Sequence, residues 1–198
     1  FTYGAFFIYL SVLDNIIPFY LFLSVLMVGS IYELVNINNK PKGFIIKITT
    51  IVYILISFFL LIIIRNEANG SLLIIILISQ IWATDIGGDI IGYFFGKHKF
   101  LKISPKKTWE GIFGSIILCL ITGMCIRNRI HSTIEVNWII ISILICISSI
   151  VGDLIISKIK RLNNKKESGV FLPGHGGFLD RLDSLFLATP IYYFAICI

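Results

Sequence analysis

The stretch GVFLPGHGGFLDRLDS, residues 169–184, concentrates polar chemistry directly before an apolar C-terminal segment. Its glycines favour a backbone that turns with positive φ and points consecutive N–H groups at one place. Such a nest binds anions, and Gly176 and Gly177 are its candidate donors. His175 has three open roles: a phosphate contact, a structural hydrogen-bond donor or a proton carrier. The stretch therefore favours a site for a phosphate group.

The same stretch also carries charged side chains that suit a metal ion. Asp180 and Asp183 offer hard oxygen ligands of the kind that Mg²⁺ prefers. Arg181 can bind a phosphate through two parallel hydrogen bonds. Because acids and bases alternate, we favour a metal ion together with a polyphosphate over a cage for a single ion.

A second polar stretch, KISPKKTWEG, occupies residues 102–111 in front of an apolar segment. Thr108 is a candidate N-cap, with Gly111 as the third residue of the helix that follows. Lysines and hydroxyls beside a free helix N-terminus suit a phosphate, although lysines at a helix start are also common topogenic charges. The candidate phosphate ligands are Ser104, Lys106, Lys107 and Thr108.

Two acids lie inside an apolar segment, in the stretch WATDIGGDIIGYFFG. Asp85 and Asp89 are one helical turn apart and share a face. Carboxylates in a bilayer are costly and usually serve an ion, a substrate or a partner, whereas the plain alternative is a packing helix with tolerated polar residues. Glycines repeat beside them at every fourth residue, which lets another helix approach closely, either in the same chain or in a homodimer. These glycines are Gly88, Gly92 and Gly96.

A further acid, Asp153, begins a polar stripe near the end of another apolar segment. Ser157, Lys160 and Arg161 continue that stripe on one helical face. Basic side chains at a helix end are often explained by snorkelling to water. That explanation does not cover Asp153, which lies deeper, so we interpret it as part of a site.

The elements that position these residues are membrane helices. The chain is 57% hydrophobic and 14% charged, with a mean hydropathy of +0.91, which exceeds what a soluble core of 198 residues can bury. We predict an all-α, polytopic membrane protein with about seven segments. The expected segments are 1–13, Ile16–Val35, Phe44–Ile64, Leu72–Phe95, Trp109–Ile126, Trp138–Ile156 and Leu185–Ile198.

We divide the chain into N-terminal segments, 1–70, and a catalytic membrane domain, 71–198. Because the chain begins at Phe1 and not at methionine, we expect the N-terminal part to be truncated. The four cysteines stand singly in apolar runs, so we interpret them as small buried hydrophobes and not as disulfides or metal ligands.

Basic residues gather in three alternate loops, which hold 14 of the 17 lysines and arginines. They follow the second, fourth and sixth segments, around Lys40, Lys102 and Lys165. By the positive-inside rule these loops face the cytoplasm of a bacterial inner membrane. The polar stretches lie in or beside the same loops, so we expect an active site at the cytoplasmic face.

These stretches resemble a known family. GDLIISKIKR followed by KKESGVFLPGHGGFLDRLDS, residues 152–184, is similar to the C-terminal signature of phosphatidate cytidylyltransferases, also called CDP-diacylglycerol synthases. SPKKTWEG and ATDIGGDIIGYFFGKHKF resemble two further blocks, so the likeness runs from about Trp82 to the C-terminus. One position departs from the pattern, because the family usually has Lys-Asp where this chain has Lys166-Glu167.

The resemblance implies that CTP and phosphatidate react to CDP-diacylglycerol and pyrophosphate, in contact with membrane lipids and without nucleic acid. It implies Mg²⁺ on Asp153 and Asp180, and it leaves room for a second, monovalent cation. The expected catalytic residues are Asp153, Asp180, Lys160, Arg161, His175 and Arg181. The expected substrate-binding residues are Asp85, Asp89, Ser104, Lys106, Lys107, Thr108, Ser157, Lys166, Gly176, Gly177 and Asp183.

Two other classes of protein compete with this interpretation. Another CTP-dependent lipid transferase or a polyprenol kinase would use the same nucleotide, but the long C-terminal signature argues against both. An ion-coupled transporter would also place acids in the membrane. Transporters tend to show a repeat and a midplane site, whereas here the polar residues cluster at one face.

Overall fold

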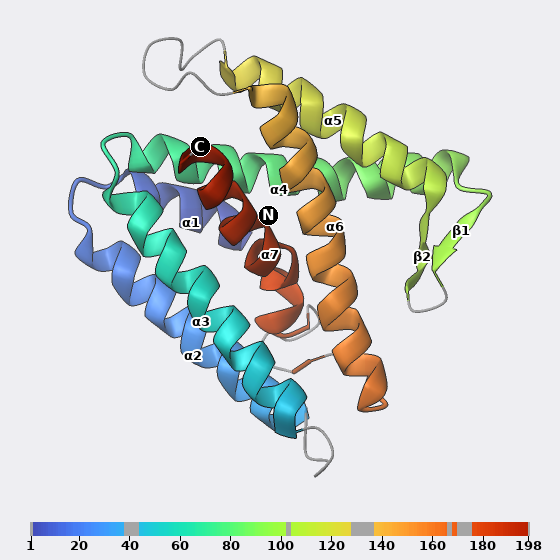
Figure 1. The fold of residues 1–198 in the computed structure, drawn as a ribbon, viewed down its shortest axis with the longest axis horizontal. Coiled ribbons are helices and arrows are strands. Elements are labelled where there is room, and N and C mark those ends of the chain that lie inside the picture. Colours follow the sequence, from blue (N-terminus) through green and yellow to red (C-terminus); the bar gives the residue numbers. More distant parts are fainter. Residues whose placement is uncertain are drawn as a thin grey trace.

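The structure is a computed structural model that describes residues 2–37, 44–101, 104–127, 137–165, 168–169 and 176–197. Within these ranges the chain forms seven helices and one short hairpin (Figure 1). The helices are α1 Thr2–Val12, α2 Ile17–Ile37, α3 Phe44–Asn66, α4 Gly70–Phe95, α5 Trp109–Arg127, α6 Trp138–Leu162 and α7 Leu179–Cys197. Five of them, α2 to α6, are long and apolar enough to cross a membrane. The prediction of an all-α, polytopic membrane protein is confirmed.

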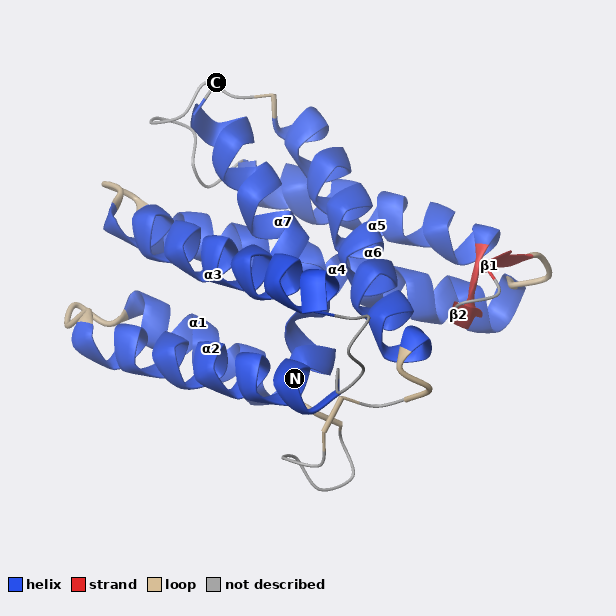
Figure 2. Ribbon diagram, turned by 60° about the horizontal axis from the view of Figure 1, so that its bottom comes forward, coloured by secondary structure: helices blue, strands red, loops and turns tan. Residues whose placement is uncertain are grey.

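The hairpin between α4 and α5 was not predicted. Strand β1, Lys99–Leu101, pairs antiparallel with β2, Ser104–Thr108, and it stands at one end of the helical body (Figure 2). Its strands are too short and too rich in lysine to show the alternation that identifies a strand. The hairpin ends where α5 begins, and there Thr108 Oγ1 accepts a hydrogen bond from the Gly111 N–H at 3.1 Å. The predicted N-cap is therefore confirmed.

Helix α7 lies in the middle of the body and contacts α2, α3, α4 and α6 (Figure 1). Its Phe186 and Tyr192 are completely buried. Ser57 of α3 donates a hydrogen bond to the carbonyl of Phe186. On the α6 side, Gly152 permits close approach, because a Cβ there would lie 2.7 Å from the Asp183 carbonyl oxygen. The first turn of α7 is thereby held against α6.

The glycine stripe of α4 packs against α5 of the same chain. A Cβ on Gly88 would lie 2.7 Å from Ser115 Oγ, and one on Gly111 would lie 2.8 Å from the Gly88 carbonyl oxygen. Small residues thus bring the two backbones together, as the repeat predicted. Because this face of α4 is covered by α5, the stripe gives no support to a homodimer, which stays a prediction.

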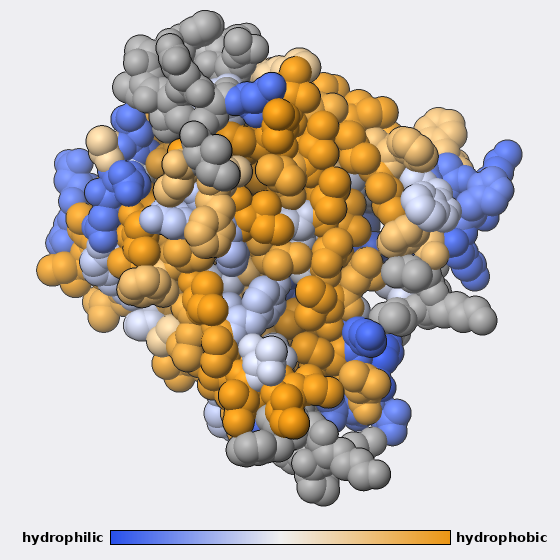
Figure 3. All heavy atoms as spheres, in the orientation of Figure 1, coloured by the Kyte–Doolittle hydropathy of each residue, from blue (hydrophilic) through white to orange (hydrophobic). Residues whose placement is uncertain are grey.

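The surface matches a protein surrounded by lipid. Hydrophobic side chains cover most of the face in Figure 3, while hydrophilic ones gather over the hairpin, over the end of α6 and along the left edge of the view. Large apolar residues such as Phe59 and Phe113 are more than 60% exposed, which water would penalise and a bilayer would not.

Successive helices end on opposite sides of the molecule, which is the alternation that the basic residues predicted. The end of α2, the start of α3, the hairpin and the end of α6 lie toward the lower right of Figure 1, opposite the α3–α4 turn. Lys165 Nζ donates to the Asn36 carbonyl at 3.0 Å and so joins the end of α6 to the end of α2. The predicted basic loops therefore start from one side of the molecule.

Candidate active site

A cavity of about 1010 Å³ lies among α1, α2, α4, β2, α5, α6 and α7. One part of its wall is apolar and is formed by Phe7, Phe22, Leu26 and Trp82. Further isoleucine and leucine side chains line the cavity, together with a polar part that includes most of the predicted residues that the structure describes. A space with both kinds of wall can hold an amphiphile with its charged end toward the polar side.

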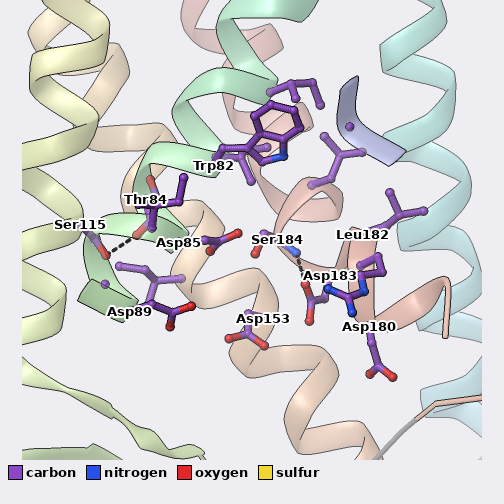
Figure 4. A pocket seen from close by; sticks show the side chains of 18 of the residues that line it. Trp82, Thr84, Asp85, Asp89, Ser115, Asp153, Asp180, Leu182, Asp183 and Ser184 are labelled. Carbon is purple, nitrogen blue, oxygen red and sulfur yellow. Dashed lines mark hydrogen bonds between the residues drawn. The ribbon is translucent and has the colours of Figure 1, made fainter. Parts of the chain in front are cut away.

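Carboxylates from three helices face this cavity (Figure 4). Asp85 and Asp89 come from α4, Asp153 comes from α6, and Asp183 comes from the N-terminal part of α7. The side chains of Asp153 and Asp183 interact with each other. Asp183 is 9% exposed, and its Oδ1 also accepts the Ser184 N–H at 2.8 Å. The close approach of α6 and α7 thus brings two acids together that are 30 positions apart in sequence.

Two lysines neutralise part of this charge. Lys107 of β2 forms an ion pair with Asp153, and Lys160 of α6 forms one with Asp180. Ser157 Oγ donates to Asp153 at 3.2 Å. The predicted stripe of α6 therefore turns Asp153, Ser157 and Lys160 toward the site. Of these three, Asp153 lines the cavity itself, while Ser157 and Lys160 reach it through their contacts with Asp153 and Asp180. The fourth member, Arg161, is exposed, and its Nη1 donates to the Lys165 carbonyl at 3.3 Å.

Asp180 lies at the edge of the cavity, with its carboxylate away from the other labelled acids (Figure 4). Its Oδ2 accepts from the Ser168 N–H at 2.9 Å, from Ser168 Oγ at 2.8 Å and from the Gly177 N–H at 3.3 Å. Burial by itself would raise the pKa of the Asp180 carboxyl, but hydrogen bonds from Lys160 and Ser168 outweigh it and hold that pKa below its usual value. Asp180 is thus ionised, and its carboxylate holds Ser168 and Gly177 in place by hydrogen bonds.

The glycine stretch turns as predicted at one position, because Gly176 has a φ of +81°. The Gly177 N–H, expected to bind phosphate, donates to Asp180 here. A phosphate at this point would have to compete with that carboxylate. The role of both glycines in substrate binding stays a prediction.

The remaining candidates divide into two groups. Ser104, Lys107, Thr108 and Arg181 line the cavity, so the hairpin and the start of α5 contribute to it as expected. His175 and Lys166 lie outside the described residues, as does Glu167, and the side chain of Lys106 is likewise not described. Their roles stay predictions.

Two residues that support this site from outside the cavity, Glu33 and Ser168, were not predicted from the sequence. Glu33 of α2 is 2% exposed, and its Oε2 lies 3.0 Å from Ser168 Oγ. A lone carboxylate near the end of an apolar span is costly for the same reason as Asp85. That argument, applied to α2 as well, would have found Glu33.

The carboxylates of the site are oxygen donors, the ligand type that a divalent ion such as Mg²⁺ takes. Among the described residues five aspartates line the cavity but only two cationic side chains, Lys107 and Arg181. The described residues contain no group of three or more His, Cys, Asp or Glu side chains arranged to hold a metal ion. Mg²⁺ commonly takes only one or two carboxylates and completes its octahedron with water and substrate phosphates. Asp153, Asp180 and Asp183 are of the chemical type required.

The chain is similar in sequence to several known proteins. The chain is 36% identical over 134 residues to the phosphatidate cytidylyltransferase of Haemophilus influenzae, covering 65% of this chain and 46% of that protein. It is 33% identical over 185 residues to the enzyme of the same name from Rickettsia bellii, covering 89% of this chain and 79% of that protein. An uncharacterized Escherichia coli protein, YnbB, is 36% identical over 132 residues.

The chain spans slightly less than half the length of several of these relatives, with 44% of the YnbB protein and 46% of the Haemophilus enzyme covered. The model of the cytidylyltransferase family matches residues 1–198, which is the whole chain. The resemblance noted in the sequence is thereby confirmed at the level of the family. The chain belongs to the cytidylyltransferase family.

Proposed function

We propose that this protein is a phosphatidate cytidylyltransferase, which converts CTP and phosphatidate into CDP-diacylglycerol and pyrophosphate. Its family and the names of its relatives support the proposal. The observation that carries it is the composition of one cavity, which is lined both by the Lys107–Asp153 ion pair and by the apolar side chains Phe22 and Trp82. A phospholipid and a nucleoside triphosphate can meet only at a site that offers both charged and apolar side chains.

The reaction joins two polyanions at the edge of the membrane. A phosphate oxygen of phosphatidate attacks the α-phosphorus of CTP, and the bond from that phosphorus to the oxygen bridging to the β-phosphorus breaks. Pyrophosphate leaves with the electron pair, and no proton has to move when the attacking phosphate is ionised. The protein therefore contributes mainly orientation and charge neutralisation.

The described residues divide these tasks by their place in the cavity. Lys107 and Thr108, beside the N-terminus of α5, are proposed to bind the CTP phosphates, and Arg181 is proposed to clamp a phosphate from the α7 side. Asp153 and Asp180 are proposed to hold Mg²⁺, with Asp183 next to Asp153 as a further oxygen donor. When bound, Mg²⁺ would neutralise phosphate charge and stabilise the leaving pyrophosphate. We also propose that the protein binds a second, monovalent cation.

A labelled-nucleotide assay tests the function. Purified protein in detergent receives phosphatidate with CTP labelled at either the α- or the γ-phosphorus, with and without Mg²⁺. We expect the α-label to appear in the lipid and the γ-label in pyrophosphate, and only with the metal ion. Transfer of the γ-label would identify a kinase. No transfer of either label, together with ion uptake in vesicles, would identify a transporter.

We also propose that the protein lies in a bacterial inner membrane with the site facing the cytoplasm. The support is the alternation of basic loops, and it predicts the result of a labelling experiment. A cysteine at Lys165 in a cysteine-free background should react with a membrane-impermeant maleimide only after spheroplasts are opened. A cysteine at Glu67, in the opposite turn, should react in intact spheroplasts. The reverse pattern would contradict the orientation.

Glu167 departs from the family pattern, and this predicts a modest role for it. If its carboxylate bound the metal directly, one extra methylene would move its oxygens by roughly 1 Å or more, which can cost about a hundredfold in rate. An indirect role tolerates either acid. We expect Glu167→Asp to be nearly silent and Glu167→Gln to lower kcat less than tenfold.

The comparison for Glu167 is a steady-state CTP assay beside Asp180→Asn. If Glu167→Gln were as inactive as Asp180→Asn, Glu167 would be a direct metal ligand. The pair of Asp153 and Asp180 would then be an incomplete metal site.

A further inference from the structure

Glu33 of α2 lies at the start of α7, although the two helices are about 145 residues apart in the chain. Its Oε1 accepts a hydrogen bond from the Phe178 N–H at 2.9 Å, and its Oε2 accepts one from the Leu179 N–H at 2.9 Å. Helix α7 begins at Leu179, so both donors belong to its N-terminus, where backbone N–H groups have no partner within the helix. Glu33 thus caps α7 from another helix.

The charge of Glu33 is compensated by this cap. The side chain is 2% exposed, and among the described residues no lysine or arginine forms an ion pair with it. A buried carboxylate is tolerated when hydrogen bonds and nearby positive potential replace water. The two N–H groups and the positive end of the α7 dipole supply both. The cap on α7 therefore requires a carboxylate at position 33.

Glu33 also reaches Asp180 through one hydroxyl. Ser168 Oγ lies 3.0 Å from Glu33 Oε2 and 2.8 Å from Asp180 Oδ2, and since it has one proton it donates to one carboxylate at a time. The surrounding glycines make room for Glu33. A Cβ on Gly177 would lie 2.2 Å from Glu33 Oε2, and one on Gly169 would lie 2.7 Å from Oε1. Gly169 and Gly177 thus both leave the space that the Glu33 carboxylate occupies.

We propose that Glu33 is a positioning residue, which fixes the first turn of α7 and thereby the places of Asp180 and Asp183. Glu33 does not line the cavity and acts on the reaction only through α7. The kinetic part of this inference rests on the proposed cytidylyltransferase activity. The structural part does not, because it concerns the order of one backbone segment.

Glu33→Gln is the test variant, because it keeps the size but replaces one acceptor oxygen with an NH₂ group that faces N–H donors. Ser30→Ala is the matched control, since Ser30 is buried one turn earlier on α2 and, among the described residues, its hydroxyl bonds within its own helix, to the Leu26 carbonyl. Hydrogen–deuterium exchange of the segment 176–184 measures the order of the turn. The CMP-transfer assay gives kcat and the KM for CTP.

For Glu33→Gln we expect exchange in 176–184 to rise about tenfold, as one or two buried hydrogen bonds are lost, with α3 unchanged. We expect kcat to fall roughly tenfold. The KM for CTP should change by less than about threefold, since two of the three described residues proposed to bind phosphate, Lys107 and Thr108, lie on other elements. Glu33→Asp should recover part of the kcat. Ser30→Ala should leave exchange and rate as in the unaltered protein.

Unchanged exchange in 176–184 for Glu33→Gln, or an equal rise across α3, would overturn the proposal. So would a raised KM with normal kcat. If Glu33→Gln does not fold, Ser168→Ala decides, because it removes the bridging hydroxyl from the other side: faster exchange in 176–184 supports the proposal and unchanged exchange overturns it. If the unaltered protein transfers no CMP, the proposed function fails, while the exchange experiment still decides the role of Glu33.

Discussion

Asp153→Asn should lower kcat for CMP transfer by roughly a thousandfold, the loss seen when one preorganised electrostatic group is removed from an active site. The substitution keeps the size of the side chain and removes its charge. Asp153 lies between Lys107 and Asp183, so its loss leaves Lys107 without its partner and removes an oxygen donor proposed for Mg²⁺. Binding of the lipid tail, which the apolar wall would provide, should not change.

The measurement is the initial rate of CMP transfer over a range of Mg²⁺ concentrations. Ser148→Ala is the matched control on α6, because Ser148 is buried and its hydroxyl donates, within the part of the chain that the structure describes, to the Ile145 carbonyl of its own helix. It should keep nearly full activity. A rate for Asp153→Asn close to that of the unaltered protein, at any Mg²⁺ concentration, would remove Asp153 from the proposed site.

Lys107→Met should raise the KM for CTP by roughly ten- to a hundredfold, which corresponds to the loss of one hydrogen bond to a charged group. Methionine keeps most of the length and flexibility of lysine but has no charge. Lys107 enters the cavity from β2 and lies beside Thr108, at the N-terminus of α5. Because it faces the nucleotide side of the proposed site, the KM for phosphatidate should rise less.

Lys99→Met controls for a change in the hairpin itself, since Lys99 lies on β1 opposite Thr108 and is exposed. It should change neither KM. An equal rise in both KM values for Lys107→Met would mean that Lys107 serves the metal site through Asp153 and does not bind CTP.

Local patterns in the sequence determined the helices. Long apolar runs predicted the bounds of α3, α5 and the start of α6 to within a residue or two, because a bilayer requires every backbone group to be paired within its own helix. The N-cap at Thr108 and the positive φ at Gly176 were equally predictable. Each depends on a few neighbouring residues and on no distant contact.

The partners of the charged side chains were decided by the tertiary structure. Helical periodicity placed Asp153 and Lys160 on one face of α6, but their pairing with Lys107 and Asp180 depends on how β2 and α7 pack against α6. The hairpin itself was missed, because its few residues have too little alternation to reveal a strand.

Glu33 shows most clearly which features depend on the local sequence and which depend on tertiary packing. The sequence by itself determined that an apolar helix carries one acid near its end, and that a glycine-rich stretch ending at Gly177 precedes another helix. It did not determine that the acid caps that helix, because a hydrogen bond between segments so far apart depends on the packing of α2 against α7. Periodicity is a local property, whereas the burial that makes a carboxylate seek those N–H groups arises only when the whole bundle has assembled.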